Sequence, residues 1–492
     1  MTRAELYRRF HSRKDAWDIV VIGGGATGIG IAVDAASRGY ATLLLEQNDF
    51  GKGTSSRSTK LIHGGVRYLG QGSLPLVMEA LRERGRLLRN APHLVHPLAF
   101  VVPAYRWWEL PYFGTGLKLY GLLAMGQSLG LPYLLSRNET LRRLPGARAE
   151  GLRGGILYFD GQFDDARLLI HLALTAIGHG AALLNYAQVT DVSRTGVRFR
   201  DLETGEEHAA AGRIVINAAG PFADAVRRLA EPRAQPILQP SQGVHLVLDR
   251  GFLPGDTALL VPRTPDGRVM FAIPWLGHTL IGTTDTPVAE APLEPAARES
   301  EIAFLLETAG QYLEKRPSRG DILSVFAGIR PLVGGQGKDT AELSRDHTIR
   351  LEPSGMLTIA GGKWTTYRRM AEDCVDRAAA HAGLPERPCA TQHLPIHRSP
   401  EAGGGGTPLH PALPYTEADI IRSARGEMAR TLEDALARRT RALFLNARAA
   451  LEMAPAAAAV LAGELGRDAA WEREQVAAFE RLAQGYLPPE MR

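Results

Sequence analysis

Residues 18–28 read DIVVIGGGATG, and this stretch decides the fold of the amino-terminal part of the chain. Residues 18–22 form a short apolar run rich in β-branched residues, which predicts a buried parallel strand. The spacing of apolar residues then becomes helical over 26–38, Gly39 ends that helix, and 41–46 is a second apolar strand. This order predicts one β-α-β unit.

The three glycines Gly23, Gly25 and Gly28 stand in GxGxxG register between the predicted strand and helix. The first permits a tight turn, the second lets backbone amides approach a pyrophosphate, and the third lets the helix pack closely on the strand. The helix amino terminus adds partial positive charge for the phosphates. Glu46 can accept hydrogen bonds from ribose hydroxyls and disfavours a 2′-phosphate, so the pattern predicts FAD or NAD rather than NADP.

A second glycine segment lies far along the chain. Residues 361–366 read GGKWTT and follow an apolar run at 357–360. Alone, this segment could be an ordinary strand-to-helix turn. A flavin dinucleotide is long enough to need both segments, with its pyrophosphate at the first and its ring edge near the second, so the pair favours FAD.

The middle of the chain has the pattern of an antiparallel sheet, with predicted strands at 243–248, 269–274 and 279–282. Apolar runs at 213–217 and 357–360 predict that the chain returns to the first sheet. Four consecutive glycines at 403–406 predict a linker, because such a run is costly to hold in one conformation. After it, Ala, Leu, Arg and Glu recur at helical spacing.

These features predict an α/β + α protein: a Rossmann-like FAD-binding domain, an antiparallel-sheet substrate domain or cap, and a helical carboxy-terminal domain. The FAD-binding core and the interleaved cap occupy 1–400. Within it, the FAD segments are expected at about 15–75, 150–225 and 325–385, and the cap at about 76–149 and 226–324. A glycine linker at 401–406 leads to the helical domain at 407–492.

Composition narrows the classes of function. The 492 residues are 45% hydrophobic and 22% charged, and the formal net charge is only +4. Lys and Arg are scattered rather than gathered in a basic tract, so we expect no nucleic-acid partner. The two cysteines form no CxxC pair, which is typical of a reducing compartment. With no secretory signal pattern near the amino terminus and no run of ~20 apolar residues, we expect a cytoplasmic protein.

Several cations interrupt apolar or glycine-rich runs, where an uncompensated charge is costly. Arg330 lies within AGIRPL, Arg345 within LSRDH, and Lys363 in the second glycine segment; Arg67 and Tyr68 lie within KLIHGGVRYL. Each alone would ordinarily be a surface cation or an ion-pair partner. Together they indicate a site for a dianion such as a phosphate, which Arg binds in a bidentate manner.

A flavin that oxidised a phosphorylated alcohol at this dianion site would need, besides the cations, a base that takes the hydroxyl proton. His245 is the best candidate, because it alternates with apolar residues on a predicted strand. The alternative is a core histidine whose hydrogen bonds are satisfied by the backbone. His63 is a second candidate base, better suited to shaping the flavin loop. The histidines lack HxH and HExxH spacing, so we expect no metal.

Taken together, these segments resemble the FAD-dependent glycerol-3-phosphate dehydrogenase family, a branch of the D-amino-acid-oxidase-like flavoproteins. The resemblance covers almost the whole chain, and the segments at 60–69 and 361–368 are the most specific to the family. It is carried by residues 20–28, 54–69, 164–168, 217–221, 281–285, 327–332 and 361–368, and in the helical tail by 429–434 and 438–441.

The resemblance implies that sn-glycerol-3-phosphate is oxidised to glycerone phosphate by hydride transfer from C2 to the flavin, with a membrane quinone as electron acceptor. It also implies that His245, Arg330, Arg345 and Lys363 are catalytic. In this interpretation Arg330 and Arg345 hold the phosphate, and Lys363 stabilises charge on the reduced ring. Arg67 and Tyr68 narrow the pocket, and the substrate-binding residues are Arg67, Tyr68, Arg330, Arg345 and Lys363.

One position departs from the family pattern. Val244 stands immediately before His245, where a small or hydroxyl residue is expected. The predicted flavin contacts come from all of the glycine-rich and polar segments. They are Gly23, Gly24, Gly25, Ala26, Thr27, Gly28, Glu46, Gln47, Thr54, Ser55, Ser58, Thr59, Leu61, His63, Val189, Ala218, Ala219, Gly220, Asp285, Gly361, Gly362, Lys363 and Thr365.

Three alternatives stay open from the sequence: an oxidase of the same fold that uses O2 and releases peroxide, an amine or amino-acid oxidase, and a flavin-binding scaffold or regulatory protein. Aromatic and basic residues at 105–108 and 111–113 precede an apolar stretch at 117–135. They suit peripheral contact with the inner face of the cytoplasmic membrane, although a buried apolar segment explains them equally well. A homodimer also stays open.

Overall fold

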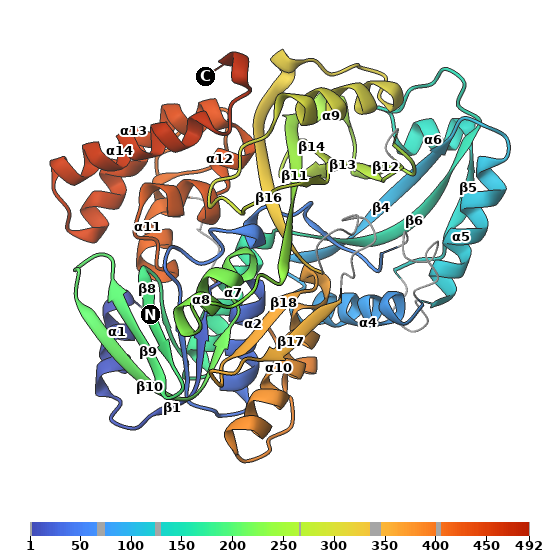
Figure 1. Ribbon diagram of the computed structural model, residues 1–492. Helices are drawn as coiled ribbons and strands as arrows, with labels where there is room; N and C mark the ends of the chain where they lie inside the picture. The colour runs from blue at the N-terminus through green and yellow to red at the C-terminus, as the bar shows by residue number, and fades with distance from the viewer. Residues whose placement is uncertain are drawn as a thin grey trace.

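The computed structural model describes residues 2–65, 74–123, 129–264, 267–334, 346–399 and 405–491. Two sheets and a group of carboxy-terminal helices make up the molecule (Figure 1). No helix within these described ranges is both long enough and apolar enough to cross a bilayer.

The first sheet contains the predicted β-α-β unit. Its strand order is β17-β18-β10-β1-β2-β7, with five parallel strands and β17 as an antiparallel edge. The predicted returns of the chain at β10 and β18 are confirmed, and a hairpin of β8 and β9 extends β10. The strands are β1 (Trp17–Ile22), β2 (Thr42–Leu45), β7 (Ala182–Leu184), β8 (Ala187–Ser193), β9 (Gly196–Asp201), β10 (Glu207–Asn217), β17 (His347–Leu351) and β18 (Leu357–Gly361).

Helix α2 (Ala26–Ser37) packs between α7 and α10, so ten of its twelve residues are buried. Such a helix must be apolar around its whole circumference, which is why Ala, Ile, Val and Gly dominate it. Gly39, with φ of +80°, lies just beyond its end. The other helices around this sheet are α1 (Arg3–Ser12), α7 (Asp165–Gly178), α8 (Ala223–Ala230) and α10 (Tyr367–Ala382).

The second sheet is largely antiparallel, as predicted for the cap, and among the described strands only β4 and β12 pair in parallel. Its order is β15-β11-β14-β13-β12-β4-β6-β3, with β16 beside β11 and β5 beside β6. Its strands are β3 (Leu61–Ile62), β4 (Val95–Ala104), β5 (Tyr133–Ser136), β6 (Gly154–Phe163), β11 (Leu238–Asp249), β12 (Thr257–Val261), β13 (Met270–Trp275), β14 (His278–Gly282), β15 (Thr286–Pro287) and β16 (Ile322–Val333).

Strands β6 and β16 pair within this second sheet, although most of their residues belong to the segments predicted for the FAD-binding part. The domain boundaries themselves stay a prediction. Four helices accompany the sheet: α4 (Leu74–Asn90), α5 (Glu109–Leu123), α6 (Arg137–Arg143) and α9 (Glu299–Tyr312).

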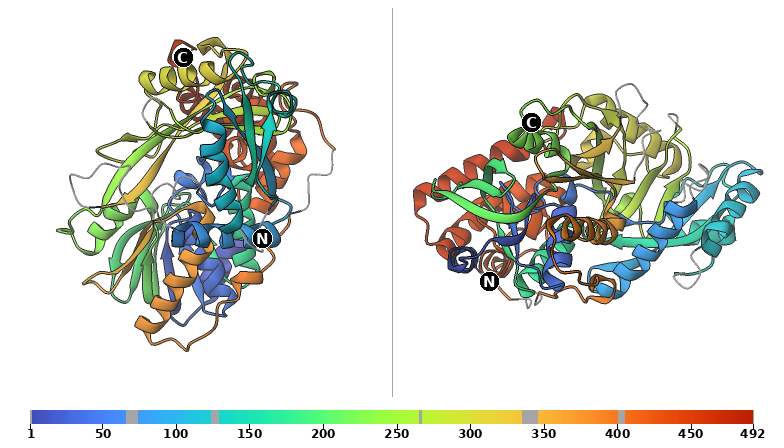
Figure 2. Two further views of the ribbon diagram at one scale, coloured as in Figure 1. Left: turned by 90° about the vertical axis from the view of Figure 1, so that its right-hand side faces the viewer. Right: turned by 60° about the horizontal axis from the view of Figure 1, so that its bottom comes forward.

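The carboxy-terminal part is helical, as expected, and includes a π-helical turn at Asp434–Arg439 that the sequence pattern did not predict. Its helices are α11 (Glu417–Glu427), α12 (Ala442–Leu445), α13 (Ala447–Leu465) and α14 (Ala469–Gln484). They share one apolar core with the cap sheet, where the rings of Phe326 and Phe444 lie 4.8 Å apart. Helices α13 and α14 lie at the opposite end of the molecule from α5 and β5 (Figures 1 and 2).

Strand β11 shows how the two faces of the cap sheet differ. Val244, Leu246 and Leu248 pack into the cluster that includes α9, whereas Val247 belongs to the cluster shared with the carboxy-terminal helices. Successive side chains of a strand point to opposite faces. His245 therefore lies on the same face as Val247, away from α9.

Candidate active site

The turn after β1 brings backbone segments so close together that only glycine fits at two of its positions. Gly23 has φ of +111°, and a Cβ atom there would lie 2.6 Å from the carbonyl oxygen of Ala218. A Cβ atom at Gly28 would overlap the carbonyl oxygen of Gly23. Helix α2 then begins after Gly25, which has no side chain to cap the helix, and a helix amino terminus of this kind favours an anion. The turn therefore fits the pyrophosphate of a dinucleotide.

Glu46 lies directly beyond β2 and faces this turn. Its carboxylate accepts hydrogen bonds from the backbone N–H groups of Gly24, at 2.6 Å, and Asn48, at 2.8 Å. Burial raises the pKa of Glu46. Ser55 also reaches the turn, because its Oγ accepts from the N–H of Ala26 at 2.9 Å. The Glu46 carboxylate and the Ser55 hydroxyl therefore both lie against the glycine turn.

The other predicted flavin contacts near the glycine turn come from neighbouring strands and loops. Ala218 and Ala219 pack directly against Gly23. Val189 lies on β8, whose first residue, Ala187, donates its N–H to the carbonyl oxygen of Glu46 at 2.8 Å. Gln47 is exposed beside Glu46. Their contacts with the flavin stay predictions.

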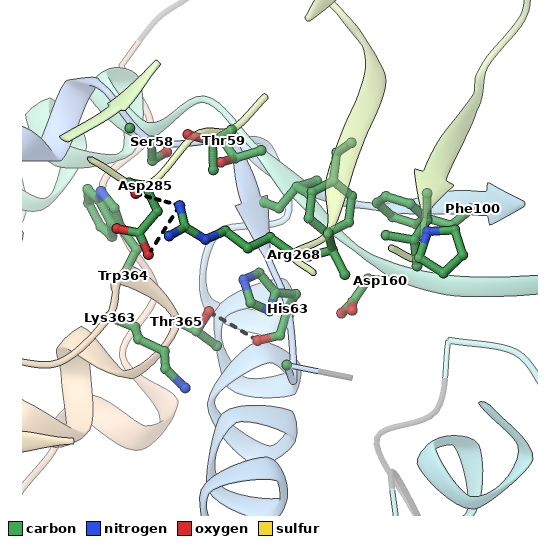
Figure 3. A pocket seen from close by; sticks show the side chains of 18 of the residues that line it. Ser58, Thr59, His63, Phe100, Asp160, Arg268, Asp285, Lys363, Trp364 and Thr365 are labelled. Atoms are coloured by element: carbon green, nitrogen blue, oxygen red, sulfur yellow. Dashed lines mark hydrogen bonds and ion pairs between the residues drawn. The ribbon is translucent and has the colours of Figure 1, made fainter. Parts of the chain in front are cut away.

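A cavity of about 1150 Å³ lies between the two sheets (Figure 3). It brings together predicted residues from three distant parts of the chain, which supports one continuous site for a flavin ring and a substrate. The predicted residues that line it are Thr54, Ser58, Thr59, Leu61, His63, His245, Asp285, Arg330, Gly361, Gly362, Lys363 and Thr365.

His245 is buried, and its ring stacks on Phe326 with centroids 4.9 Å apart. Its Nε2 atom is 2.9 Å from Oγ1 of Thr59. Its Nδ1 atom is buried and has no hydrogen-bond partner among the residues that the structure describes. Gly282 stands opposite on β14, and a side chain there would collide with the imidazole. Burial, and then the charges of Lys60 and Arg330, lower the pKa of His245 well below its ordinary value, so the ring is neutral.

Arg330 projects from β16 across Gly243, where a Cβ atom would collide with the guanidinium group. Its Nη1 atom is 3.3 Å from a carboxylate oxygen of Asp285, and Nη2 donates to the carbonyl oxygen of Thr284 at 3.0 Å. Ser241 donates its hydroxyl to the same carboxylate. About a quarter of the Arg330 side chain stays exposed to the cavity side, so the cation is both fixed and accessible.

Lys363 follows Gly361 and Gly362, which have φ of +80° and +79°. Next to it, Trp364 donates its indole N–H to the carbonyl oxygen of Ser55 at 2.9 Å, and Thr365 donates to the carbonyl oxygen of His63 at 3.3 Å. The second glycine segment is thus tied to the first flavin segment by hydrogen bonds. Residues 361–366 therefore lie beside residues 55–63 of the segment predicted to contact the flavin.

Sequence reasoning missed two cations of this cavity, Arg268 and Arg57. Arg268 donates to the carbonyl oxygen of Asp285 at 2.5 Å, as Figure 3 shows. Arg57 is held by the carboxylate of Glu294 at 2.7 Å. No motif marks Arg268; the hairpin of the consecutive strands β13 and β14 brings it beside Asp285. Arg57 lies inside the quoted motif at 54–69 and could have been found there.

Three predicted substrate residues, Arg67, Tyr68 and Arg345, lie outside the described residues. The segment that leads toward the first two is well anchored. The N–H of Gly64 donates to the hydroxyl of Tyr120 at 2.8 Å, and that hydroxyl donates to Asp160 at 2.9 Å. No group of three or more His, Cys, Asp or Glu side chains in the described ranges could hold a metal ion.

Comparisons with known proteins agree with this geometry. A family model described as FAD dependent oxidoreductase matches residues 18–384, and one described as C-terminal domain of alpha-glycerophosphate oxidase matches residues 389–472. A probable mitochondrial glycerol-3-phosphate dehydrogenase from Caenorhabditis elegans is 41% identical, covering 94% of this chain and 73% of that protein.

The chain belongs to the FAD-dependent glycerol-3-phosphate dehydrogenase family.

The human mitochondrial glycerol-3-phosphate dehydrogenase is 40% identical over 94% of this chain and 72% of its own length. The crystal structure of the glycerol-3-phosphate dehydrogenase from Bacillus halodurans complexed with FAD aligns with a TM-score of 0.77 and 29% identity, covering 99% of both chains. Membership of this glycerol-3-phosphate dehydrogenase family confirms the predicted fold class, and FAD is the cofactor.

Proposed function

We propose that this protein oxidises sn-glycerol-3-phosphate to glycerone phosphate and passes the electrons to a quinone. One observation carries the proposal: Arg330, Lys363 and a neutral His245 line the same cavity as the flavin-binding segments. Two cations suit a dianionic phosphate, and a neutral imidazole suits a proton acceptor. The names of the two relatives and of the Bacillus halodurans protein support the same substrate.

In the proposed reaction, Arg330 binds the phosphate through its planar guanidinium group, and Lys363 adds a second charge. His245 accepts the proton of the C2 hydroxyl while the C2–H electron pair leaves as hydride and a carbonyl group forms. FAD, when bound, supplies the hydride acceptor. The Thr59 hydroxyl, 2.9 Å from Nε2, orients the imidazole.

The quinone proposal rests on the apolar end of the cavity. Beyond the polar residues, the cavity is lined by Trp108, Tyr112 and Leu119 at α5, and these side chains are also exposed on the molecular surface. An apolar acceptor could therefore reach the site from a lipid surface. We propose that the protein is cytoplasmic and binds the inner face of the cytoplasmic membrane through this end. Assembly into a homodimer stays a prediction.

A substrate and acceptor panel tests the proposed function. Turnover is measured with sn-glycerol-3-phosphate, glycerol and glycine, each with a soluble quinone analogue without oxygen and with oxygen alone. We expect glycerone phosphate to form from the first substrate only and fastest with the quinone. Fast peroxide release without quinone reduction would instead identify an oxidase, and turnover of glycine would identify an amine oxidase.

Replacement of Arg330 by Ala tests the phosphate site. Loss of a charged contact typically costs about 2–5 kcal/mol, so kcat/KM for glycerol-3-phosphate should fall by roughly 30- to 4000-fold at about 1.4 kcal/mol per tenfold change. The bound FAD should be retained. Arg250→Ala is the matched control, because Arg250 is an exposed arginine that directly follows β11 and pairs with Asp256. An Arg330→Ala enzyme as active as this control would rule out the phosphate site.

A further inference from the structure

Two motifs of the sequence have no role in the proposed reaction: residues 164–168 and the arginine-rich segment 438–441. The structure brings them together at residues 49–60. That segment carries four of the predicted flavin contacts, Thr54, Ser55, Ser58 and Thr59. The carboxy-terminal helices lie against it although the partners are far apart in sequence: Asp49 and Arg438, which are in contact, are separated by 389 residues.

The first part of this contact fixes the beginning of the segment. The carboxylate of Asp49 accepts hydrogen bonds from Arg438 at 2.6 Å and from Arg439 at 2.6 and 2.8 Å. Lys52 forms ion pairs of 2.5 Å with Glu433 and with Glu294. Asp49, Arg438 and Arg439 are almost completely buried. Although burial alone would raise it, the two arginines lower the pKa of Asp49 to about 2.

The second part surrounds Asp165, the first residue of α7. One carboxylate oxygen accepts from the Lys60 ammonium group at 2.7 Å and from the Ser58 N–H and hydroxyl at 3.0 and 2.7 Å. The other accepts from Arg441 at 3.2 Å. Lys60 and Arg441 also both donate to the carbonyl oxygen of Ser56, each at 2.9 Å. One arginine of the carboxy-terminal domain thus holds the backbone of the flavin segment.

The backbone conformations of the two cations agree with a positional role. Lys60 and Arg441 have φ of +64° and +72°, a region that is costly for residues other than glycine. Such conformations persist where surrounding contacts fix them, and they cluster at functional sites. A buried ion pair alone is weak evidence for stability, because desolvation offsets the attraction. We therefore expect this cluster to fix the position of residues 54–60 rather than to add to the stability of the fold.

We propose that Arg441 is a positioning residue for FAD: through Ser56 and Asp165 it holds residues 54–60 in the shape that binds the cofactor. The carboxy-terminal domain is then part of the flavin site, although it supplies none of the predicted contacts. This inference rests on FAD being the cofactor and is independent of the substrate.

Arg441→Gln tests it by two measurements that do not depend on turnover. The first is the FAD dissociation constant, from flavin fluorescence; the second is the difference in Tm between the FAD-bound and FAD-free forms. We expect the dissociation constant to rise about 10- to 100-fold, by analogy with residues that support the direct ligands of a metal ion. The Tm difference should shrink, because ligand stabilisation depends on affinity. Arg425→Gln is the control, an exposed arginine of the same domain paired with Glu464.

A purely structural role would lower both Tm values together and leave the FAD dissociation constant unchanged, and that result would overturn the proposal. If Arg441→Gln does not fold, Arg441→Lys keeps the charge without the planar donor group. For this variant we expect a smaller rise in the dissociation constant, and affinity equal to that of the unmodified protein would equally overturn the proposal. Asp165→Asn should weaken FAD binding as well, and its effect should not add fully to that of Arg441→Gln.

Discussion

At the scale of single residues, two glycines make room for the chemical groups of the site. Gly282 faces His245 across β11 and β14, and Gly243 lies beneath the guanidinium group of Arg330. Both belong to strands that the sequence pattern predicts. Their register does not follow from that pattern, however, because it depends on pairing between strands far apart in the chain.

The protonation state of His245 should set the pH dependence of flavin reduction by the substrate. Its pKa lies well below the ordinary value, because burial and the nearby cations disfavour the charged ring. The proton-accepting form is the neutral one, so it persists as the pH falls through 6.5 and is lost only at a lower pH. We therefore expect the rate of flavin reduction by saturating substrate to show no loss near pH 6.5.

Replacement of His245 by Gln should slow that rate roughly 10²- to 10⁴-fold, the usual contribution of a general base, and leave the FAD spectrum intact. The measurement is stopped-flow absorbance between pH 5 and 9, with exposed His393→Gln as the control. An inflection at pH 6.5 in the unmodified protein that disappears in His245→Gln would contradict the burial argument.

At the scale of elements, the β-α-β unit was predictable because its signals are local. Strand, glycine turn, helix and Glu46 follow one another within thirty residues, and the structure places them as expected. The contact between residues 49–60 and the carboxy-terminal helices was not predictable. The sequence pattern predicts only that Arg438, Arg439 and Arg441 lie in a helical tail, whereas the structure buries all three in ion pairs with distant carboxylates.

Gly28→Ala tests the turn of this unit. The added Cβ atom would overlap the backbone oxygen of Gly23, which no side-chain movement can relieve. We expect loss of bound FAD and destabilisation of about 1–3 kcal/mol, as for other overpacked sites. Gly463→Ala is the control, because nothing lies within 4 Å of its added Cβ atom on helix α13; it should stabilise the protein by about 0.5–1 kcal/mol. FAD content and Tm are measured, and a Gly28→Ala protein with normal FAD content would contradict the assignment.

At the scale of the whole molecule, exposed apolar side chains gather at one end. Trp107, Tyr112 and Leu131 are 77%, 68% and 70% exposed, and Leu122 and Leu134 lie nearby on α5 and β5. Exposed arginines, including Arg106 and Arg137, accompany them. A grouping of aromatic, apolar and basic side chains is typical of a surface that binds anionic lipid. The sequence suggested this stretch but could not separate its buried side chains, such as Leu117 and Tyr120, from its exposed ones.

Sedimentation with anionic vesicles tests this surface. We expect the protein to sediment with the vesicles, less so at high salt, because the basic residues contribute through a screened attraction. The double substitution Trp107→Ser and Leu122→Ser should weaken binding several-fold. Leu202→Ser is the control, since Leu202 is an exposed leucine of the other sheet's hairpin. Equal binding by both variants would place the membrane contact elsewhere.

The central claim is that the cations of the cavity present glycerol-3-phosphate to FAD. The most direct measurement is the visible spectrum of the FAD-loaded protein before and after sn-glycerol-3-phosphate is added without oxygen. We expect the absorbance of the oxidised flavin to bleach and one equivalent of glycerone phosphate to appear. A flavin that stays oxidised with this substrate, yet is reduced by dithionite, would contradict it.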